Sequence, residues 1–387
     1  MRGWIVACAA VGVLAAGCSR QLAVGVVLPE TGAAAIYGAS IKSGVKLAFD
    51  TALAARTAPP GLEVLYRDSG SDEARAASAA EALYDAGALV IIGGATSAEA
   101  KAMIPVADRW ERVLVSPSAS APELARMSVY FFRVYPSDDL EGVKAADLLA
   151  ISRNARSVLI LEEDNAYTRG LLPVFIGELK NQGGRVVASV RIGEMGWENE
   201  VRKALASGPP QAVYVCGYGG AILEALRVLR SLDYGGAICT TSAINTAGLL
   251  QRAGSLAEGV FLPLASLDLA SQQEPIRSFV KRYHEVYNML PDIYAAHGYD
   301  AALAAMWALT DLHPVAGRQL QLRFKGLADR RGVTGLLAFD DFGNVKHYPR
   351  SHWIRNGRVE DYDAFVEREK DRIRRQMEEL MSRGGSS

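Results

Sequence analysis

Short apolar runs alternate with amphipathic stretches through the first third of the chain. The runs are continuously apolar, which is typical of strands covered by helices on both faces. They predict strands at Leu22–Leu28, Leu62–Tyr66, Leu89–Ile92 and Val113–Val115, with helices between them at Ala39–Ala54, Asp72–Tyr84 and Ala98–Trp110. Ser71 and Ser97 are the candidate N-caps of the last two helices. This alternation predicts a parallel, doubly wound sheet.

The same alternation restarts after the turn at residues 136–139. It predicts strands at Val158–Leu161, Val186–Ile192, Ala212–Val215 and Ala237–Thr240, and helices at Leu140–Ala150, Arg169–Gln182, Glu198–Ala206 and Ala221–Leu232. The fold class is therefore α/β, with two doubly wound parallel-sheet lobes. Sheets of this kind hold ligands at the carboxyl ends of their strands, so the pattern predicts a binding cleft between the lobes.

The pattern changes after residue 275. Two helices are expected at Ile276–Tyr287 and Ile293–Leu312, followed by hairpin-like strands at Gly335–Phe339 and His352–Arg355, with turns at 341–344 and 356–357. A charged helix over 361–382 ends the pattern. Its apolar residues fall on one face, which either packs on the body or docks a partner: Phe365, Ile373, Met377 and Leu380.

The N-terminus has the pattern of a targeting segment. Arg2 precedes an apolar stretch, Trp4–Ala16, that is too short to span a bilayer permanently. The following Leu14–Cys18 resembles a bacterial lipoprotein lipobox, which implies removal of residues 1–17, acylation of Cys18 and a lipidated N-terminus at 18–20. The alternative is an ordinary signal peptide that is cut nearby. Either reading predicts an exported protein, and the first predicts membrane attachment through lipid only.

Composition narrows the class of protein. The 387 residues favour two or three compact units, and the 50% apolar share is that of an ordinary globular chain. The net charge of −1 offers no positive surface for a phosphate backbone, so nucleic acid is not an expected partner.

Cysteine and histidine give no metal site. Removal of the leader leaves Cys216 and Cys239 at the ends of apolar runs, where a disulfide and two buried thiols are equally compatible with the sequence. The histidines lack the spacing of metal ligands, so neither metal nor cofactor is expected.

Catalytic signatures are also missing. The sequence has no phosphate-binding loop, nucleophile elbow or zinc-protease pair. Gly217–Gly220 comes nearest to a dinucleotide fingerprint, but Ile222 occupies the place of its third glycine. The chain is therefore expected not to be an enzyme.

Two hydroxyl-rich loops follow neighbouring predicted strands. Ile91–Glu99 ends a strand with two glycines and opens a helix near Ser97, and Val115–Leu124 repeats this arrangement. Free N–H groups and the helix dipole at such a point favour an anion, so the two loops could hold one carboxylate together. In the alternative interpretation, Ser97 only caps its helix.

Several segments, in order, resemble the type I periplasmic solute-binding proteins of branched-chain amino acid ABC transporters. The resemblance extends from about residue 21 to 360. It rests on Val24–Gly32 with Tyr37-Gly38, Ser116–Leu124, Asp164–Tyr167, Tyr294–Ala301, and Gly332–Gly335 with Phe339-Asp340.

The resemblance implies a ligand site. Ser97 and Ser120 would bind a ligand carboxylate, helped by the backbone around Ser118, while Tyr37, Tyr167 and Tyr218 would line the pocket or serve only packing. The family usually places an acid for the ligand's ammonium in the loop that is Thr241–Thr246 here, and this loop has none. Because a buried ammonium needs a counter-charge, and Ser242 could bind a neutral group, an amide, a urea-like compound or a small organic acid is as compatible as leucine.

The family fold also implies domain boundaries and a mechanism. Lobe one would comprise 21–136 and 265–332, lobe two 137–264 and 333–360, and the C-terminal helix and tail 361–387, with a three-strand hinge between the lobes. The lobes would close on a small solute and deliver it to the permease of an ABC importer. The alternative is a non-transport lipoprotein of the same fold that acts as a regulator or sensor through protein contacts.

Overall fold

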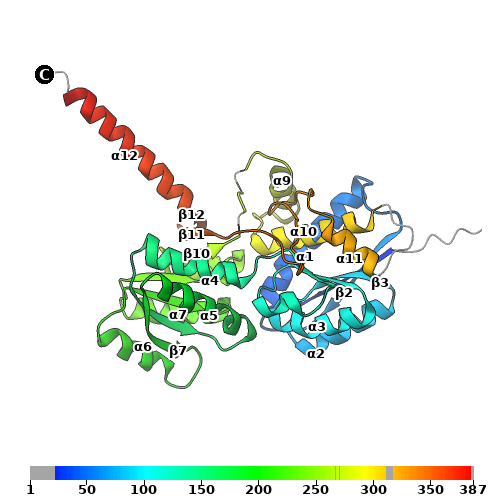
Figure 1. Cartoon of the computed structure of the whole chain (residues 1–387), viewed down its shortest axis with the longest axis horizontal. Helices are drawn as coiled ribbons and strands as arrows, with labels where there is room; N and C mark the ends of the chain where they lie inside the picture. Colours follow the sequence, from blue (N-terminus) through cyan, green and yellow to red (C-terminus); the bar gives the residue numbers. More distant parts are fainter. Residues whose placement is uncertain (1–21, 266, 270, 311–316, 385–387) are drawn as a thin grey trace, which may run out of the picture.

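Two α/β lobes lie side by side in the computed structural model, which describes residues 22–265, 267–269, 271–310 and 317–384 (Figure 1). The leader and Cys18 lie outside the described residues, as do the side chains of 379–384. Among the described helices, none has both the length and the apolar character needed to cross a membrane.

Lobe one is built on a five-stranded parallel sheet in the order β2-β1-β3-β4-β5. Its central strands are almost fully buried because helices cover both faces. The strands are β1 Leu22–Leu28, β2 Leu62–Asp68, β3 Ala88–Gly93, β4 Val113–Ser116 and β5 Phe131–Arg133; the helices are α1 Ala35–Ala54, α2 Glu73–Asp85, α3 Ser97–Trp110, α9 Ile276–Tyr287, α10 Ile293–Leu309 and α11 Arg318–Lys325.

Lobe two repeats this strand order in β7-β6-β8-β9-β10 and adds two antiparallel strands, β11 and β12, beyond β10. The expected doubly wound fold is confirmed in both lobes. The strands are β6 Ser157–Glu162, β7 Arg185–Arg191, β8 Ala212–Cys216, β9 Ala237–Thr240, β10 Phe261–Leu264, β11 Arg350–Arg355 and β12 Arg358–Asp361; the helices are α4 Asp138–Asp147, α5 Ala166–Asn181, α6 Trp197–Ala206, α7 Gly219–Ser231 and α8 Ala247–Ala253.

The chain passes between the two sheets three times: between β5 and α4, between β10 and α9, and between α11 and β11. Fully buried Arg133, at the end of β5, ties two of these passages together. Its Nε donates to Asn344 Oδ1 at 2.7 Å, and its backbone bonds to Gly343 and Val345. Its Nη1 also donates to the carbonyl of Ala121, so the two passages are linked to the loop that follows β4 at the carboxyl end of the lobe-one sheet.

Helices α1 and α10 cross at a close contact made by glycines. A Cβ added to Gly44 would lie 1.9 Å from the carbonyl oxygen of Ala295, and one added to Gly298 would lie 2.4 Å from that of Ile41. Only glycine permits this approach, which places the second and third turns of α1 against the start of α10.

The helix starts differ from the sequence expectation at both candidate caps. Asp72, not Ser71, caps α2 by accepting from the N–H of Arg75, while Ser71 binds the loop before α1. Thr96, not Ser97, caps α3 in a reciprocal pair with Glu99. Both predictions were wrong by one residue, and in the second case the Ser97 hydroxyl is released from capping.

The C-terminal strands also differ from expectation. The hairpin at 356–357 joins β11 to β12, both of its turn residues having positive φ. Gly335–Phe339 makes only isolated bridges, one of them from Phe339 to Val345 around the turn at 341–344. Strand β10 was not predicted, because Pro263 interrupts its apolar run.

Cys216 and Cys239 are free and buried, so the disulfide alternative is wrong. Cys239 on β9 pairs with Tyr214, which places Cys216 two residues further along β8. Two residues along one strand and one interstrand spacing separate the Cα atoms by about 8 Å. A disulfide spans at most roughly 7 Å between Cα atoms.

Helix α12, Tyr362–Gly384, projects away from the body (Figure 1). Among its described side chains, those at its start anchor the helix, where Tyr362 and Phe365 pack against Trp353. Ile373 and Met377 are 50% and 58% exposed, so this part of the apolar face does not pack on the body as one interpretation required. The side chain of Leu380 lies outside the described residues.

Candidate functional site

A small cavity lies where the carboxyl ends of the two sheets face each other, with about 340 Å³ between its lining atoms when the part open to solvent is included. All seven ligand-binding residues predicted from the sequence line it, together with four residues that were not predicted as binding residues. The predicted ones are Tyr37, Ser97, Ser118, Ser120, Tyr167, Tyr218 and Ser242; the additional ones are Ala95, Tyr135, Ala243 and Tyr294.

The lobe-one wall is made by the two hydroxyl loops after β3 and β4. The Ser118 Oγ donates to the carbonyl of Ala95 at 2.6 Å, and the N–H of Ala121 donates to Ser97 Oγ at 3.2 Å. These bonds join the loops into one surface. Because Ser97 Oγ accepts from Ala121 and takes no part in capping α3, its proton is available to the cavity.

Five tyrosines, two of them from lobe two, form most of the remaining lining, and Ser242 and Ala243 complete it. Tyr37 packs on Tyr218 and Tyr294, with ring centroids 5.8 and 5.0 Å away, and Tyr167 stacks on Tyr218 at 5.4 Å. Tyr135 stacks on Tyr294 at 6.3 Å. Burial raises the pKa of every one of these phenols, so all remain neutral donors and acceptors.

Tyr37 bonds across the cavity to lobe two. Its Oη accepts from the N–H of Gly219 at 2.7 Å and donates to the carbonyl of Ala243 at 3.0 Å. Gly219 begins α7 and Ala243 lies in the turn Ser242–Ile244. One phenol of lobe one therefore uses both of its hydrogen-bonding capacities on the backbone of lobe two.

A buried carboxylate that the sequence analysis did not select lies behind the lobe-two wall. Glu141 of α4 accepts from the N–H and the hydroxyl of Ser242, both at 2.9 Å, and from the hydroxyl of Tyr167 at 3.1 Å. Burial raises the pKa of Glu141, and these hydrogen bonds oppose the rise. The carboxylate that binds the acid-free loop 241–246 comes from about a hundred residues earlier in the sequence.

A second buried acid, Asp138, lies at the start of α4. Neither of its carboxylate oxygens makes a hydrogen bond of normal length, although its N–H donates to the carbonyl of Ser120. Burial and the neighbouring Glu141 raise the pKa of Asp138. Burial also lowers the pKa of Arg133 to about 10, against the attraction of Asp138.

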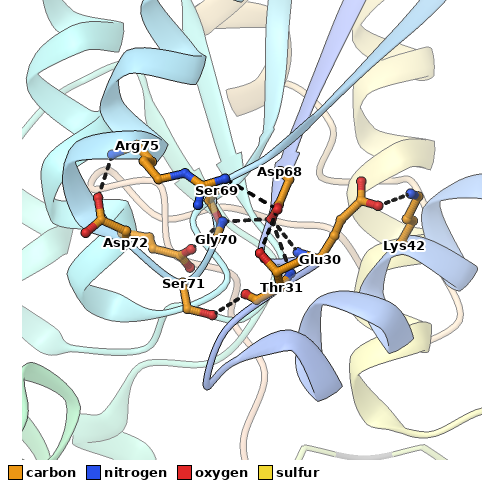
Figure 2. Close-up of polar contacts among 10 residues, drawn as sticks. Glu30, Thr31, Lys42, Asp68, Ser69, Gly70, Ser71, Asp72 and Arg75 are labelled. Carbon is orange, nitrogen blue, oxygen red and sulfur yellow. Dashed lines mark hydrogen bonds and ion pairs between the residues drawn. The ribbon is translucent and has the colours of Figure 1, made fainter.

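The loop that leads into α1 is held by Asp68 at the end of β2 (Figure 2). Its carboxylate accepts from the N–H groups of Glu30, Thr31 and Gly70 and from the hydroxyl of Thr31. Burial alone would raise the pKa of Asp68, but these donors lower it to about 2. This network fixes the approach of the chain to Tyr37.

The missed residues had weak sequence signals. Tyr294 stands in the first turn of α10, and Tyr135 lies two residues after β5, so their places near strand or helix ends could have suggested them. Glu141 had no such signal, because it lies inside a helix and reaches the cavity wall through Tyr167 and Ser242, which follow it by 26 and 101 residues.

No group of acids, histidines and cysteines in the described residues could hold a metal ion.

A model of the periplasmic binding proteins matches residues 21–347, most of the chain. The chain belongs to this family. Its members are binding proteins, not enzymes, which agrees with the catalytic signatures that are missing from the sequence.

Among curated proteins, the chain is 27% identical over 217 residues to a Leu/Ile/Val-binding protein homolog of Brucella melitensis, over 53% of this chain and 58% of that protein. The chain thus aligns with little more than half of the length of this relative. A second homolog, from Brucella suis, is 23% identical over 88% of this chain and 92% of its own length.

Solved structures share the fold. A leucine-binding protein of Thermotoga maritima superposes with a TM-score of 0.81 at 24% identity, over 88% of this chain and 97% of that one. A branched-chain amino acid binding protein of Streptococcus pneumoniae in complex with isoleucine gives 0.81 at 23%, over 88% and 98%. An R. palustris solute-binding protein in complex with benzoate gives 0.79 at 20%, over 88% and 95%.

Proposed function

We propose that this protein is an extracytoplasmic receptor of an ABC importer, which closes its two lobes on a small polar solute and presents the closed form to the permease. The observation that carries the proposal is the cavity between the strand ends of the two lobes. It combines hydroxyl groups from lobe one with tyrosines from both lobes.

In the described form the tyrosines leave room in the cavity for little more than a water molecule. A solute of metabolite size therefore needs the two walls to move apart before it binds. Relatives of the same fold were solved with isoleucine and with benzoate, so the fold accommodates both an amino acid and an aromatic acid. Ser97 and Ser120 are proposed to bind the solute from lobe one, and Tyr167, Tyr218 and Ser242 from lobe two.

Lobe closure follows from the divided lining. Because a solute between the lobes gains its full set of contacts only when both walls meet it, binding shifts the open–closed equilibrium toward the closed form. The three passages between the sheets provide the hinge, and the Tyr37 bonds to Gly219 and Ala243 belong to the closed form.

The proposal also includes export and lipid attachment through Cys18. Replacement of Cys18 by Ser should release the protein from the membrane fraction when it is expressed in a bacterial host, and persistence there would contradict lipid attachment.

A thermal-shift screen against amino acids, amides and organic acids tests the receptor function. A solute at about 100 times its dissociation constant adds about 2.7 kcal/mol to the free energy of unfolding. Ser97→Ala and Ser120→Ala should each weaken the binding of the solute that is found. Unchanged affinity in both variants would remove the assigned site, and the absence of any stabilising solute would contradict the function.

The projecting helix α12 supports a second role, contact with another protein, because Ile373 and Met377 are exposed on it. A chain that ends at residue 365 should bind its solute as the full chain does. If the second role holds, this shortened chain should no longer bind the partner protein.

A further inference from the structure

Two of the three hydroxyl groups on the lobe-two wall of the cavity, those of Ser242 and Tyr167, point their protons away from the cavity. Ser242 Oγ and Tyr167 Oη both donate to the Glu141 carboxylate, at 2.9 and 3.1 Å. A hydroxyl has one proton, so a group that donates in one direction presents only lone pairs in the others. Both residues line the cavity, and both therefore present lone pairs to it, with the phenol of Tyr135 also a hydrogen-bond partner of Ser242.

The backbone fixes the direction of these bonds. The N–H of Ser242 also donates to the Glu141 carboxylate at 2.9 Å, and an N–H cannot reverse its role as a hydroxyl can. The Glu141 carboxylate therefore accepts three hydrogen bonds, from the backbone N–H and the hydroxyl of Ser242 and from the hydroxyl of Tyr167. Hydrogen bonds to a carboxylate stabilise its ionised form. The neighbouring Asp138 accepts none of these three bonds, and burial and the charge of Glu141 raise its pKa.

The surrounding lining adds to the negative character of this wall. No lysine, arginine or histidine lines the cavity, as far as the structure describes the chain. The rings of Tyr167 and Tyr218 stack 5.4 Å apart beside Ser242, and the face of an aromatic ring attracts a cation or an N–H group.

We infer that Glu141 is a positioning residue that sets the polarity of this wall, so that the solute must present N–H donors, as an ammonium, guanidinium or amide group, to Ser242 and Tyr167. The inference rests on the proposed receptor function. It assigns to α4 the acidic role for which the loop 241–246 has no side chain, and it disfavours organic acids that lack an N–H group.

Matched pairs of probes test the inference by titration calorimetry. Each pair shares one skeleton and differs in a nitrogen donor: L-leucine with 4-methylpentanoate, and benzamide with benzoate. The wild-type protein should bind the nitrogen-bearing member of at least one pair, and at least about tenfold more tightly than its partner. Binding confined to members without nitrogen would overturn the inference and leave the receptor function standing.

Glu141→Gln tests the mechanism. The new amide group would donate to Ser242 Oγ and turn the proton of that hydroxyl toward the cavity. Affinity for the nitrogen-bearing probe should fall about tenfold or more, while the partner without nitrogen should bind as well or better. Glu162→Gln removes a charge from the same lobe at a side chain that bonds Ser189, and should leave the preference within a pair unchanged.

Equal losses for both members of a pair in Glu141→Gln would assign Glu141 a structural role and overturn the inference. Ser242→Ala serves if Glu141→Gln fails to fold, because it removes the oriented hydroxyl without changing the acid, and it should reduce the same preference. No binding of any probe, with no stabilising solute in the thermal-shift screen, would contradict the receptor function itself.

Discussion

The phenol oxygen of Tyr37 lies 2.7 Å from the backbone nitrogen of Gly219 and accepts its hydrogen bond across the cavity. Tyr37→Phe would remove this bond and the one to Ala243, and it would leave the buried N–H of Gly219 without its partner. Because each such bond contributes about 0.5–1.5 kcal/mol, we expect solute affinity to fall about tenfold.

Calorimetric titration of the solute found by screening measures this effect. Tyr348→Phe is the matched control, because Tyr348 is 75% exposed. An affinity equal to that of the wild type in Tyr37→Phe would show that these bonds do not favour the closed form.

The crossing of α1 and α10 predicts opposite effects for two glycine replacements. Gly44→Ala would drive a methyl group into the carbonyl of Ala295 and should cost about 1–3 kcal/mol of stability. Gly177 lies inside α5 with open space around its Cβ position, so Gly177→Ala should add about 0.5–1 kcal/mol. Urea unfolding measures the free energy of unfolding of both variants. An unchanged value for Gly44→Ala would mean that α1 and α10 can move apart without loss of stability.

His297 predicts a loss of stability in mild acid. Its ring is buried against Tyr135, and burial lowers the pKa of His297 to about 3, against a hydrogen bond to the carbonyl of Ile293. The unfolded chain takes up this proton near pH 6.5, so the contribution to stability is complete above that pH and is lost as the pH falls toward 3.

The change to measure is the slope of the unfolding free energy against pH between about 6 and 4. One proton taken up on unfolding corresponds to about 1.4 kcal/mol per pH unit. His297→Leu should reduce the slope by about that amount, whatever it does to stability at neutral pH, and an unchanged slope would contradict a buried neutral histidine.

Asp68 predicts a further loss in stronger acid. Because its folded pKa is about 2, below the ordinary 3.8, its contribution to stability is present above about pH 4 and is lost as the pH falls to 2. Asp68→Asn should lower stability at neutral pH and flatten the decline between pH 4 and 2. Thermal melts over this range would contradict the account if the variant and the wild type declined in parallel.

The fold could be predicted because its signals are local. Continuous apolar strands and the helices between them define both sheets, and only short or interrupted elements were missed, such as β10 with its Pro263. The N-caps were assigned one residue away, because Thr96 and Ser97 are both acceptable caps and only the bond from Thr96 to Glu99 distinguishes them.

The candidate site was predictable to the extent that its residues stand at strand and helix ends, as Ser97 and Tyr218 do. Glu141 could not be found in this way. Its position inside α4 resembles any helical acid in the sequence, and its relation to Ser242 arises only when two segments about a hundred residues apart are packed together.

A crystal structure of the protein with the first solute that stabilises it is the most direct test of solute binding between the lobes. We expect the solute in the cavity, in contact with Ser97 or Ser120 on one side and with Tyr167, Tyr218 or Ser242 on the other. A solute bound outside this cavity, or held by one lobe alone, would contradict it.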